Sequence, residues 1–197
     1  MIFNKRLTSA AHELSVVQRI YENAFPVDER RDFDVLLALI EGEPLFTVEA
    51  IVRGSEVCGF MSWWNMDGWR YIEHFAIDET CRGSGIGRRA LHQFLSRTDN
   101  VPVVIEVEPP VDDTTRRRIT FYQSMGFTLH DDYRYIQPPY AVGRMSVELN
   151  LMTWGMGLSP DCDIITRTLH RVVYGVKDGT YSFREFENSS LFPASPK

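Results

Sequence analysis

A glycine-rich segment in the middle of the chain has the residue types that bind a bulky anion. It reads Arg82-Gly-Ser-Gly-Ile-Gly87 and follows an apolar stretch. Glycines lack a Cβ, so the backbone can turn tightly and present several N–H groups to an anion. Apolar residues from Ile86 to Leu95 recur at helical spacing, and the positive end of that helix would point at the same anion. The segment therefore predicts a loop that binds pyrophosphate.

Spacing separates this loop from two other phosphate-binding loops. The dinucleotide fingerprint G-x-G-x-x-G would need glycine where Arg88 stands, and the P-loop would also need lysine where Arg89 stands. A hydrolase or a nucleotide-binding protein built on either loop is therefore disfavoured. What remains is Arg-x-x-Gly-x-Gly, written here as Arg82, Gly85 and Gly87. The structural alternative is a turn that merely joins a strand to a helix.

A second motif lies further along the chain, in the segment from Ile119 to Phe127. It ends in Phe-Tyr-x-x-x-Gly-Phe, with Gly126 as a helix C-terminal signal. In order and spacing, the two segments resemble motifs A and B of the GNAT superfamily of N-acetyltransferases, whose members use acetyl coenzyme A (acetyl-CoA). The resemblance spans roughly residues 1 to 150, and no motif covers the remainder.

The resemblance implies how acetyl-CoA would be held as the acyl donor. Backbone groups on the strand before the loop would bind the pantetheine arm, and backbone N–H groups of residues 82 to 88 would bind the pyrophosphate. Arginines at the loop would supply positive charge, and no metal is expected. The residues that the resemblance assigns to the cofactor are Phe75, Ile77, Arg82, Gly83, Gly85, Ile86, Gly87 and Arg88.

Acyl transfer to an amine needs a neutral nucleophile, an oxyanion site and a proton for the departing thiolate. Tyr122 matches the family tyrosine beside the coenzyme sulfur, so the resemblance implies that it is the general acid. The structural alternative is that Tyr122 and Phe121 are core aromatics at the helix end.

The general base is less determined by the sequence. We predict Glu73, because it shares a strand face with Tyr71 and Phe75 and a partly apolar setting would raise its pKa. His74 would point to the opposite face unless a β-bulge interrupts the strand, as the resembled fold implies. Glu106 on the neighbouring strand is a third candidate. For each of them, a structural ion pair or hydrogen bond is the alternative role.

Recognition of the acceptor is expected at the loop from Phe25 to Arg31. Asp28 and Glu29 in this loop could attract a cationic amine, although a charged helix connection would have the same composition. One position departs from the family pattern: Thr115 stands where many members carry an asparagine that contacts the pantetheine arm. That contact is therefore in doubt.

Patterns of apolar residues predict an α+β fold. Its central sheet is mixed and mostly antiparallel, with flanking helices, and the strand–helix–strand succession around the glycine loop predicts one parallel strand pair. The GNAT resemblance implies that this pair is splayed. Strands are expected at 2–7, 45–53, 56–65, 70–77, 101–107, 128–137 and 144–152, and helices at 11–25, 33–40, 86–95, 114–125 and 163–174.

We expect residues 1–154 to form the GNAT domain. Residues 155–197 would be a C-terminal helical extension and tail that packs on the same domain, with a loosely held end at 189–197. The extension could cover the sheet or an oligomer interface, and the sequence does not determine whether the chain forms a homodimer.

Composition limits the classes of protein further. The chain has 197 residues, 44% of them hydrophobic, which suffices for one full core. A net charge of −6 disfavours binding to nucleic acid or an anionic membrane. The 3 cysteines lack metal-ligand spacing, so neither a disulfide framework nor a zinc site is expected. With no signal-peptide pattern and no long apolar run, a cytoplasmic location is expected.

The sequence thus predicts an acetyl-CoA-dependent N-acetyltransferase. By this prediction, the primary amine of a small molecule or peptide attacks the thioester directly in a ternary complex, without a cysteine nucleophile. The alternative is a noncatalytic acyl-CoA-binding sensor or assembly module, with an intact loop but no base. The identity of the acceptor does not follow from the sequence, because fold does not determine substrate.

Overall fold

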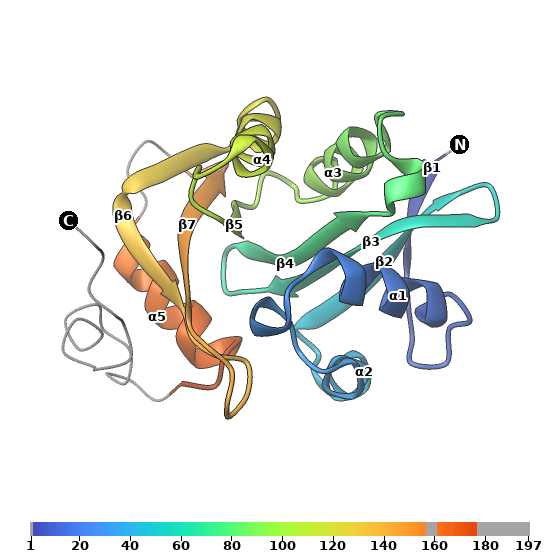
Figure 1. Cartoon of the computed structure of the whole chain (residues 1–197), viewed down its shortest axis with the longest axis horizontal. Coiled ribbons are helices and arrows are strands. Elements are labelled where there is room, and N and C mark those ends of the chain that lie inside the picture. Colours follow the sequence, from blue (N-terminus) through green and yellow to red (C-terminus); the bar gives the residue numbers. More distant parts are fainter. Residues whose placement is uncertain (1, 157–160, 177–197) are drawn as a thin grey trace.

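The computed structural model of the chain describes residues 2–156 and 161–176, and its elements follow the predicted order (Figure 1). The predicted loose end at 189–197 lies outside the described residues. The strands are β1 (Ile2–Arg6), β2 (Phe46–Arg53), β3 (Glu56–Asn65), β4 (Arg70–Ile77), β5 (Val103–Val107), β6 (Thr128–Gln137) and β7 (Val147–Trp154). The helices are α1 (Leu14–Ala24), α2 (Phe33–Gly42), α3 (Ile86–Ser96), α4 (Asp113–Gln123) and α5 (Cys162–Val172), with short 3-10 turns η1 (Val27–Glu29) and η2 (Glu79–Cys81).

The strands form one mixed sheet in the order β1-β2-β3-β4-β5-β7-β6. Only β4 and β5 pair in parallel, and their pairing runs from Arg70 opposite Val103 to Ile72 opposite Ile105. Beyond Ile72, β4 continues to Ile77 but no described strand pairs with that edge. The predicted α+β fold with a splayed parallel pair is confirmed, and the splay leaves a stretch of strand edge open.

The helices cover the two faces of the sheet (Figure 1). Helices α1, α2 and α5 bury their apolar faces in one cluster, where Tyr21, Leu36 and Leu169 are almost fully enclosed. Helices α3 and α4 bury theirs in a second cluster that contains Phe94 and Ile119. The predicted buried face of α3 is confirmed residue by residue: Ile86, Ala90, Leu91, Phe94 and Leu95. None of the helices in the described ranges is long and apolar enough to cross a membrane.

Strand β4 contains a β-bulge where it begins to leave β5. Ser62 of β3 pairs with His74 and the next residue, Trp63, pairs with Ile72, so Glu73 is the extra residue. Glu73 and His74 consequently both face α1, whereas Phe75 faces α3. This is the bulge that the resembled fold implied for this strand. The expectation that Glu73 shares a face with Phe75 was wrong, because a bulge resets the alternation of side chains along a strand.

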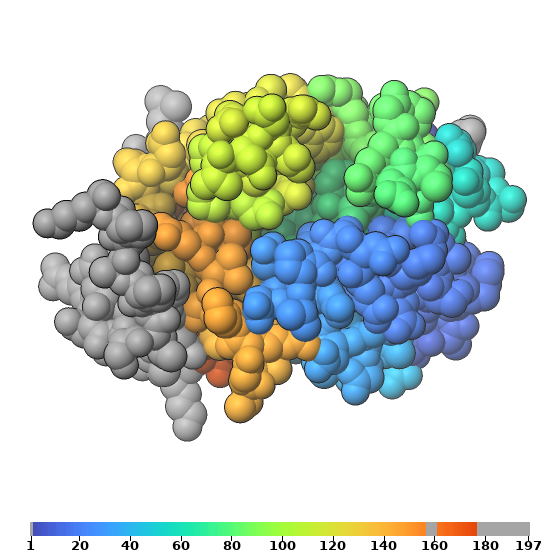
Figure 2. All heavy atoms as spheres, viewed as in Figure 1, coloured from blue at the N-terminus to red at the C-terminus, as the bar shows by residue number. Residues whose placement is uncertain are grey.

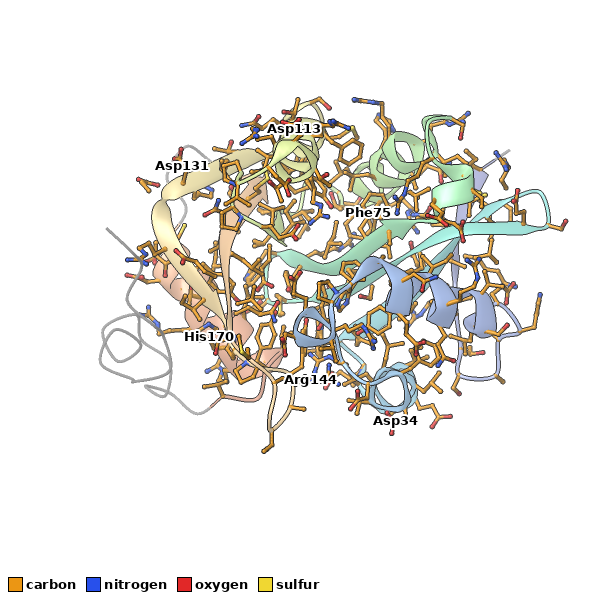
Figure 3. The ribbon with its side chains drawn as sticks, in the orientation of Figure 1. Asp34, Phe75, Asp113, Asp131, Arg144 and His170 are labelled. Carbon is orange, nitrogen blue, oxygen red and sulfur yellow. The ribbon has the colours of Figure 1, made fainter. Side chains whose placement is uncertain are left out.

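A loop between β6 and β7 reaches back to the N-terminal helices. Arg144 in this loop, labelled in Figure 3, donates hydrogen bonds to the carbonyl of Arg30 at 2.7 Å and to the carbonyl of Val27, and it pairs with Asp32. The contact fixes the segment between α1 and α2 against the far half of the sheet. That segment includes η1, which lies at the edge of the site described below.

Candidate active site

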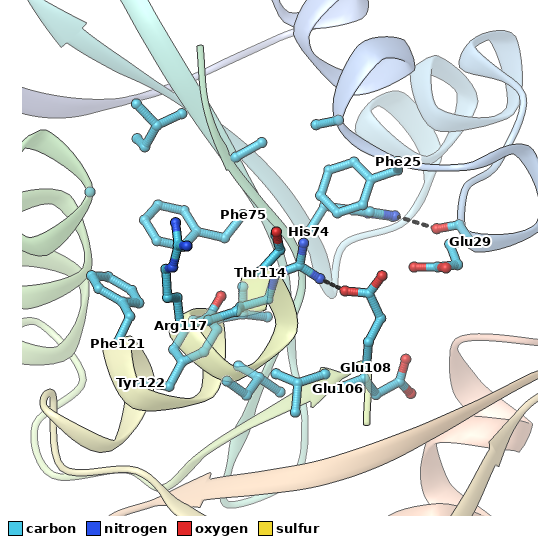
Figure 4. A pocket seen from close by; sticks show the side chains of 18 of the residues that line it. Phe25, Glu29, His74, Phe75, Glu106, Glu108, Thr114, Arg117, Phe121 and Tyr122 are labelled. Atoms are coloured by element: carbon cyan, nitrogen blue, oxygen red, sulfur yellow. Dashed lines mark hydrogen bonds and ion pairs between the residues drawn. The ribbon is translucent and has the colours of Figure 1, made fainter. Parts of the chain in front are cut away.

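A cavity of about 570 Å³ opens where β4 and β5 diverge. In the space-filling view of Figure 2 the surface is hollowed between α1, α3 and α4, and the atoms of β4 lie at the bottom. Side chains from β4, β5, α4 and the segment before α2 line it, as the close-up in Figure 4 shows. The splay of the sheet therefore produces one pocket that receives residues from distant parts of the sequence.

The glycine loop forms one wall of this cavity. Gly83 and Gly85 take φ angles of 78° and 73°, a region in which side-chain-bearing residues are strained. The first backbone bond of α3 runs from the N–H of Arg89 to the carbonyl of Gly85 at 3.1 Å. Among the described residues, the backbone N–H groups of residues 83–88 have no hydrogen-bond acceptor. The loop thus presents free donors at a helix N-terminus, the arrangement that binds anions.

Gly87 has a different reason to be glycine. A Cβ at this position would lie 3.3 Å from Cγ1 of Ile77, so α3 could not approach β4 as closely with a side chain there. All the residues predicted to bind the cofactor line the cavity: Phe75, Ile77, Arg82, Gly83, Gly85, Ile86, Gly87 and Arg88.

The arginines of this region have structural partners. Arg82 donates from Nε to the carbonyl of Ile77 at 3.0 Å, and Arg89 donates to the carbonyl of Ser84 at 2.9 Å. Arg88 donates to Oγ of Ser124 at 2.9 Å, which links α3 to the end of α4. These contacts leave the guanidinium groups near the loop, where they add positive charge to the helix terminus.

Tyr122 lies on α4 with its ring in the apolar cluster under α3 and α4 and only 8% of its surface exposed. Its ring packs edge-on against Phe121 and Phe127, yet the residue also lines the cavity. Burial raises the pKa of Tyr122 to about 12, against a smaller lowering by the charge of Arg118. Tyr122 is therefore protonated near neutral pH and holds a proton that it could donate into the cavity.

Glu73 is a fully enclosed carboxylate with partners on both oxygens. Arg31 binds Oε1 through Nη2 at 3.0 Å and Nε at 3.2 Å, Tyr140 donates to the same oxygen at 3.0 Å, and Trp64 donates to Oε2 at 2.9 Å. Burial alone would raise the pKa of Glu73, but Arg31, His74 and these donors bring it below its ordinary value. The predicted rise in this pKa was wrong, because the strand pattern does not reveal that Arg31 lies beside Glu73.

His74 has both ring nitrogens occupied. Nε2 lies 3.1 Å from the backbone carbonyl of Glu29 and Nδ1 lies 3.1 Å from Oγ of Ser62. A carbonyl can only accept, so Nε2 carries the proton and Nδ1 accepts from the serine hydroxyl. Burial lowers the pKa of His74, with partial compensation by Glu73. A neutral ring with both nitrogens bonded has no free position for a substrate proton.

Glu106 on β5 also lines the cavity but contacts hydroxyl groups instead of a cation. Tyr135 donates to Oε1 and Tyr174 donates to Oε2 at 2.9 Å. Burial raises the pKa of Glu106 to about 7, although hydrogen bonds from Tyr135, Tyr174 and Tyr71 lower it. A carboxylate that titrates near neutrality, beside a cavity, has the proton affinity expected of a general base.

The two acidic residues predicted to bind the acceptor differ in position. Glu29 lines the cavity, and burial raises the pKa of its carboxyl group, partly offset by Arg118. Asp28 is not among the residues that line the cavity: its Oδ1 accepts from the N–H of Met145 at 2.9 Å, and its carbonyl accepts from Gln137. The structure thus brings Glu29 to the site and gives Asp28 a role in fixing the loop after β6.

The start of α4 explains the position at which the sequence departs from the family pattern. Thr115 forms a capping box with Asp112: its N–H donates to the aspartate carboxylate at 2.8 Å, and its hydroxyl accepts from the aspartate N–H at 3.1 Å. The neighbouring Thr114 lines the cavity instead. Arg117 and Arg118 also line it, and Arg118 pairs with Glu108 (Figure 4).

Two cysteines that are far apart in sequence come together on the other side of the loop. Sulfur and oxygen atoms of Cys58, Cys81 and Glu56 lie within 4.8 Å of one another. Arg53 binds the Glu56 carboxylate at 2.6 Å and contacts Sγ of Cys81 at 3.8 Å, so a cation already occupies this cluster. Burial raises the pKa of Cys58 to about 12, which keeps that thiol protonated. Sequence spacing gave no sign of this juxtaposition.

Comparisons with known proteins agree with the fold and the cavity. A model of the family described as "Acetyltransferase (GNAT) domain" matches residues 42–129. A protein from Bacteroides thetaiotaomicron described as "Putative acetyltransferase from GNAT family" is 32% identical, with a TM-score of 0.81 over 89% of this chain and 99% of that chain. The chain therefore belongs to the GNAT family of acetyltransferases, as the two motifs predicted. A search of the curated proteins found no match.

More distant solved structures share the fold alone. YncA from Salmonella typhimurium, solved with its cofactor acetyl-CoA, is 19% identical with a TM-score of 0.57, over 82% of this chain and 98% of that chain. The ribosomal-protein-S18-alanine N-acetyltransferase from Escherichia coli is 15% identical with a TM-score of 0.56, over 82% of this chain and 97% of that chain.

Proposed function

We propose that this chain is an N-acetyltransferase that moves the acetyl group of acetyl-CoA to the primary amine of a small molecule or peptide. The observation that carries the proposal is that one cavity joins a loop of free backbone donors to Glu106 and Tyr122. The first feature suits a pyrophosphate, and the other two suit proton transfer during attack on a thioester. Membership of the GNAT family supports the same reaction class.

The residues of the glycine loop and of the open edge of β4 fit acetyl-CoA. The N–H groups of residues 83–88 would hold its pyrophosphate, and Gly87 keeps α3 close enough to β4 for those donors to lie beside the open strand edge. Backbone groups of Phe75 and Ile77 on that edge would bind the pantetheine arm, although the carbonyl of Ile77 already accepts from Arg82. A structural neighbour, YncA, was solved with acetyl-CoA as its cofactor.

The chemistry follows from the two titratable groups. Acetyl-CoA supplies a thioester, and a neutral amine attacks its carbonyl in a direct ternary complex. Glu106 takes the proton that the amine nitrogen loses, directly or through water, as the C–N bond forms. Tyr122 gives its proton to the sulfur as the C–S bond breaks. We assign the base to Glu106 in place of Glu73, because the Glu73 carboxylate is saturated by Arg31, Trp64 and Tyr140.

The acceptor is proposed to carry positive charge. Glu29 lines the cavity, and among the described residues its carboxylate has no hydrogen bond or ion pair, so it is available to a cationic group. Asp28 would contribute only at longer range, because its Oδ1 is bonded to Met145. Solved relatives in fold include an enzyme that acetylates an alanine of a ribosomal protein, which is also an amine acceptor.

We also infer that residues 1–154 form the acetyltransferase domain and that residues 155–197 extend it on the same core. In the described part of that extension, Ile165 and Leu169 of α5 join the cluster that α1 and α2 form. The extension therefore packs on the domain through α5, which contacts β6.

Ligand-induced stabilisation tests whether the glycine loop binds acetyl-CoA. Acetyl-CoA, ATP and NAD are compared at saturation, and acetyl-CoA at about a hundred times its Kd should add roughly 2.7 kcal/mol and raise the Tm by several degrees. Gly85→Asp should abolish that shift, since it places a side chain and a negative charge in the loop. Gly54→Asp is the matched control, because Gly54 has a similar φ of 65° but lies in the β2–β3 turn.

Turnover with a panel of amines then tests the transferase itself. Acetylated amine should form only when acetyl-CoA and the amine are both present, and Glu29→Gln should raise KM for cationic amines more than for neutral ones. A shift in Tm with acetyl-CoA but no acetylated product from any amine would favour a noncatalytic acyl-CoA sensor. A shift only with ATP or NAD would contradict the assignment altogether.

A further inference from the structure

A tyrosine just after α5 enters the active site from outside the region that the family model matches. Tyr174 donates its hydroxyl proton to Oε2 of Glu106 at 2.9 Å, while residues 42–129 make up the matched region. The same hydroxyl lies 3.3 Å from the hydroxyl of Tyr71 on β4. The C-terminal segment, residues 161–176, therefore contacts the carboxylate that we propose as the base.

The position of Tyr174 is fixed by several contacts around it. Arg31 donates to the carbonyl of Val173 at 2.7 Å, and the N–H of Tyr174 closes the helix end on the carbonyl of Leu169 at 3.2 Å. The ring of Tyr174 packs against Tyr140 with centroids 5.1 Å apart. His170, seen in Figure 3 where α5 meets β6, lies 2.9 Å from the carbonyl of Ile136. These contacts hold the Tyr174 hydroxyl at the carboxylate.

The groups that face Glu106 come from each element around it. Tyr71 and Glu73 approach from β4, Tyr135 from β6 and Tyr140 from the loop after β6, in addition to Tyr174. Among the described residues, Glu106 forms no ion pair. Its two oxygens instead accept from phenols, Oε1 from Tyr135 and Oε2 from Tyr174. The direction in which the carboxylate points, and the stability of its charged form, depend on these donors.

We propose that Tyr174 is a positioning residue for Glu106, so that the C-terminal segment completes the active site of the acetyltransferase domain. The hydroxyl of Tyr174 orients Oε2 and favours the ionised carboxylate that accepts the amine proton. This inference rests on the proposed function, because it takes Glu106 as the base.

The pH profile of kcat/KM in full-length Tyr174→Phe tests the proposal. Loss of the donor should move the acidic limb upward by about one pH unit, so that kcat/KM near pH 6 falls about tenfold while activity near pH 9 changes little. Tyr133→Phe is the matched control: its hydroxyl joins β6 to α5 through Asp163 and Thr166, both at 2.9 Å, but it does not contact Glu106. That variant should keep the wild-type profile.

A second readout needs no turnover. Titration of the Glu106 carboxyl group by NMR in the full chain with labelled glutamate should give a higher pKa in Tyr174→Phe than in the wild type. Unchanged titration and an unchanged pH profile would overturn the proposal, as would equal losses of activity at every pH in Tyr174→Phe and Tyr133→Phe. If Glu106→Gln retains full activity, the assignment of the base fails, and this result is distinct from a failure of Tyr174 alone.

Discussion

Two buried carboxylates lie on neighbouring parallel strands, Glu73 on β4 and Glu106 on β5, and they differ in the charge of their partners. Glu73 has a guanidinium partner, Arg31, at 3.0 Å, whereas Glu106 accepts from the hydroxyls of Tyr135 and Tyr174. The pKa of Glu73 is therefore below its ordinary value, and that of Glu106 is raised to about 7. Burial acts on both in the same direction, so the partner decides the outcome.

The comparison distinguishes a carboxylate with a structural role from one that is suited to proton transfer. A carboxylate held by a cation stays charged through the neutral range and cannot exchange a proton at useful pH. A buried carboxylate that accepts hydrogen bonds only from phenols has a pKa near the pH of the medium. In a cavity, such a group can accept and release protons. Glu73 thus anchors Arg31, and through it Val173 and the C-terminal segment, while Glu106 remains available for catalysis.

The largest expected effect follows from Glu106→Gln. The amide cannot accept the amine proton, so kcat/KM should fall by about 10²–10⁴-fold with little change in acetyl-CoA affinity. Steady-state kinetics at pH 8, together with a binding titration, measure both quantities. Near-normal turnover in this variant would erase the proposed difference between the two carboxylates.

Glu73→Gln should act on stability. Removal of the charge leaves Arg31 buried without its counter-ion, which costs about 3–5 kcal/mol in the free energy of unfolding. Chemical denaturation measures this loss. Glu148→Gln is the control, because Glu148 forms an exposed pair with Arg134 and should change stability by less than about 1 kcal/mol. A stable but inactive Glu73→Gln would return the base to β4.

Tyr122→Phe should lower kcat by about 100-fold, since the departing thiolate loses its proton donor. Its affinity for acetyl-CoA should stay nearly unchanged, because the variant keeps the ring that packs on Phe121 and Phe127. Single-turnover kinetics and a binding titration distinguish the two effects. Equal rates in the variant and the wild type would remove Tyr122 from the mechanism.

A further effect is expected on the pH dependence of stability. The pKa of Glu106 is higher in the folded chain, about 7, than its ordinary value of 4.5, so the folded state binds this proton more tightly. Stability should therefore fall as pH rises from about 5 to about 7, by up to about 3 kcal/mol from this group. Glu73, with a lowered pKa, contributes stability that is lost only at acid pH. Denaturation of the wild type and Glu106→Gln across this range should show a flatter curve for the variant.

The fold was largely predictable because its signals are local. Glycine spacing, the helical face from Ile86 to Leu95 and strand alternation are all short-range patterns, and the structure has each element within a few residues of its predicted bounds. The bulge at Glu73 was the exception, because it changes which side chains share a face of β4. The bulge depends on how β3 and β4 pair. The sequence of β4 alone is compatible with a bulge but does not predict one.

The residues of the site were predictable only where a single segment of the chain supplies them. The glycine loop and Tyr122 line the cavity as expected, but the pairing of Arg31 with Glu73 joins residues that lie 42 positions apart. Tyr174 reaches Glu106 from 68 positions away. Nothing in a strand reveals whether a distant arginine or a distant tyrosine will meet its carboxylate, so the choice between Glu73 and Glu106 as the base needed the structure.

Detection of acetylated amine by mass spectrometry, with wild type, Glu106→Gln and Glu73→Gln in parallel, tests whether the chain is an N-acetyltransferase with Glu106 as its base. With acetyl-CoA and a panel of cationic amines, we expect acetylated product from the wild type, nearly as much per folded molecule from Glu73→Gln, and almost none from Glu106→Gln. Acetyl-CoA binding without product from any amine, or product that Glu106→Gln forms at the wild-type rate, would contradict this expectation.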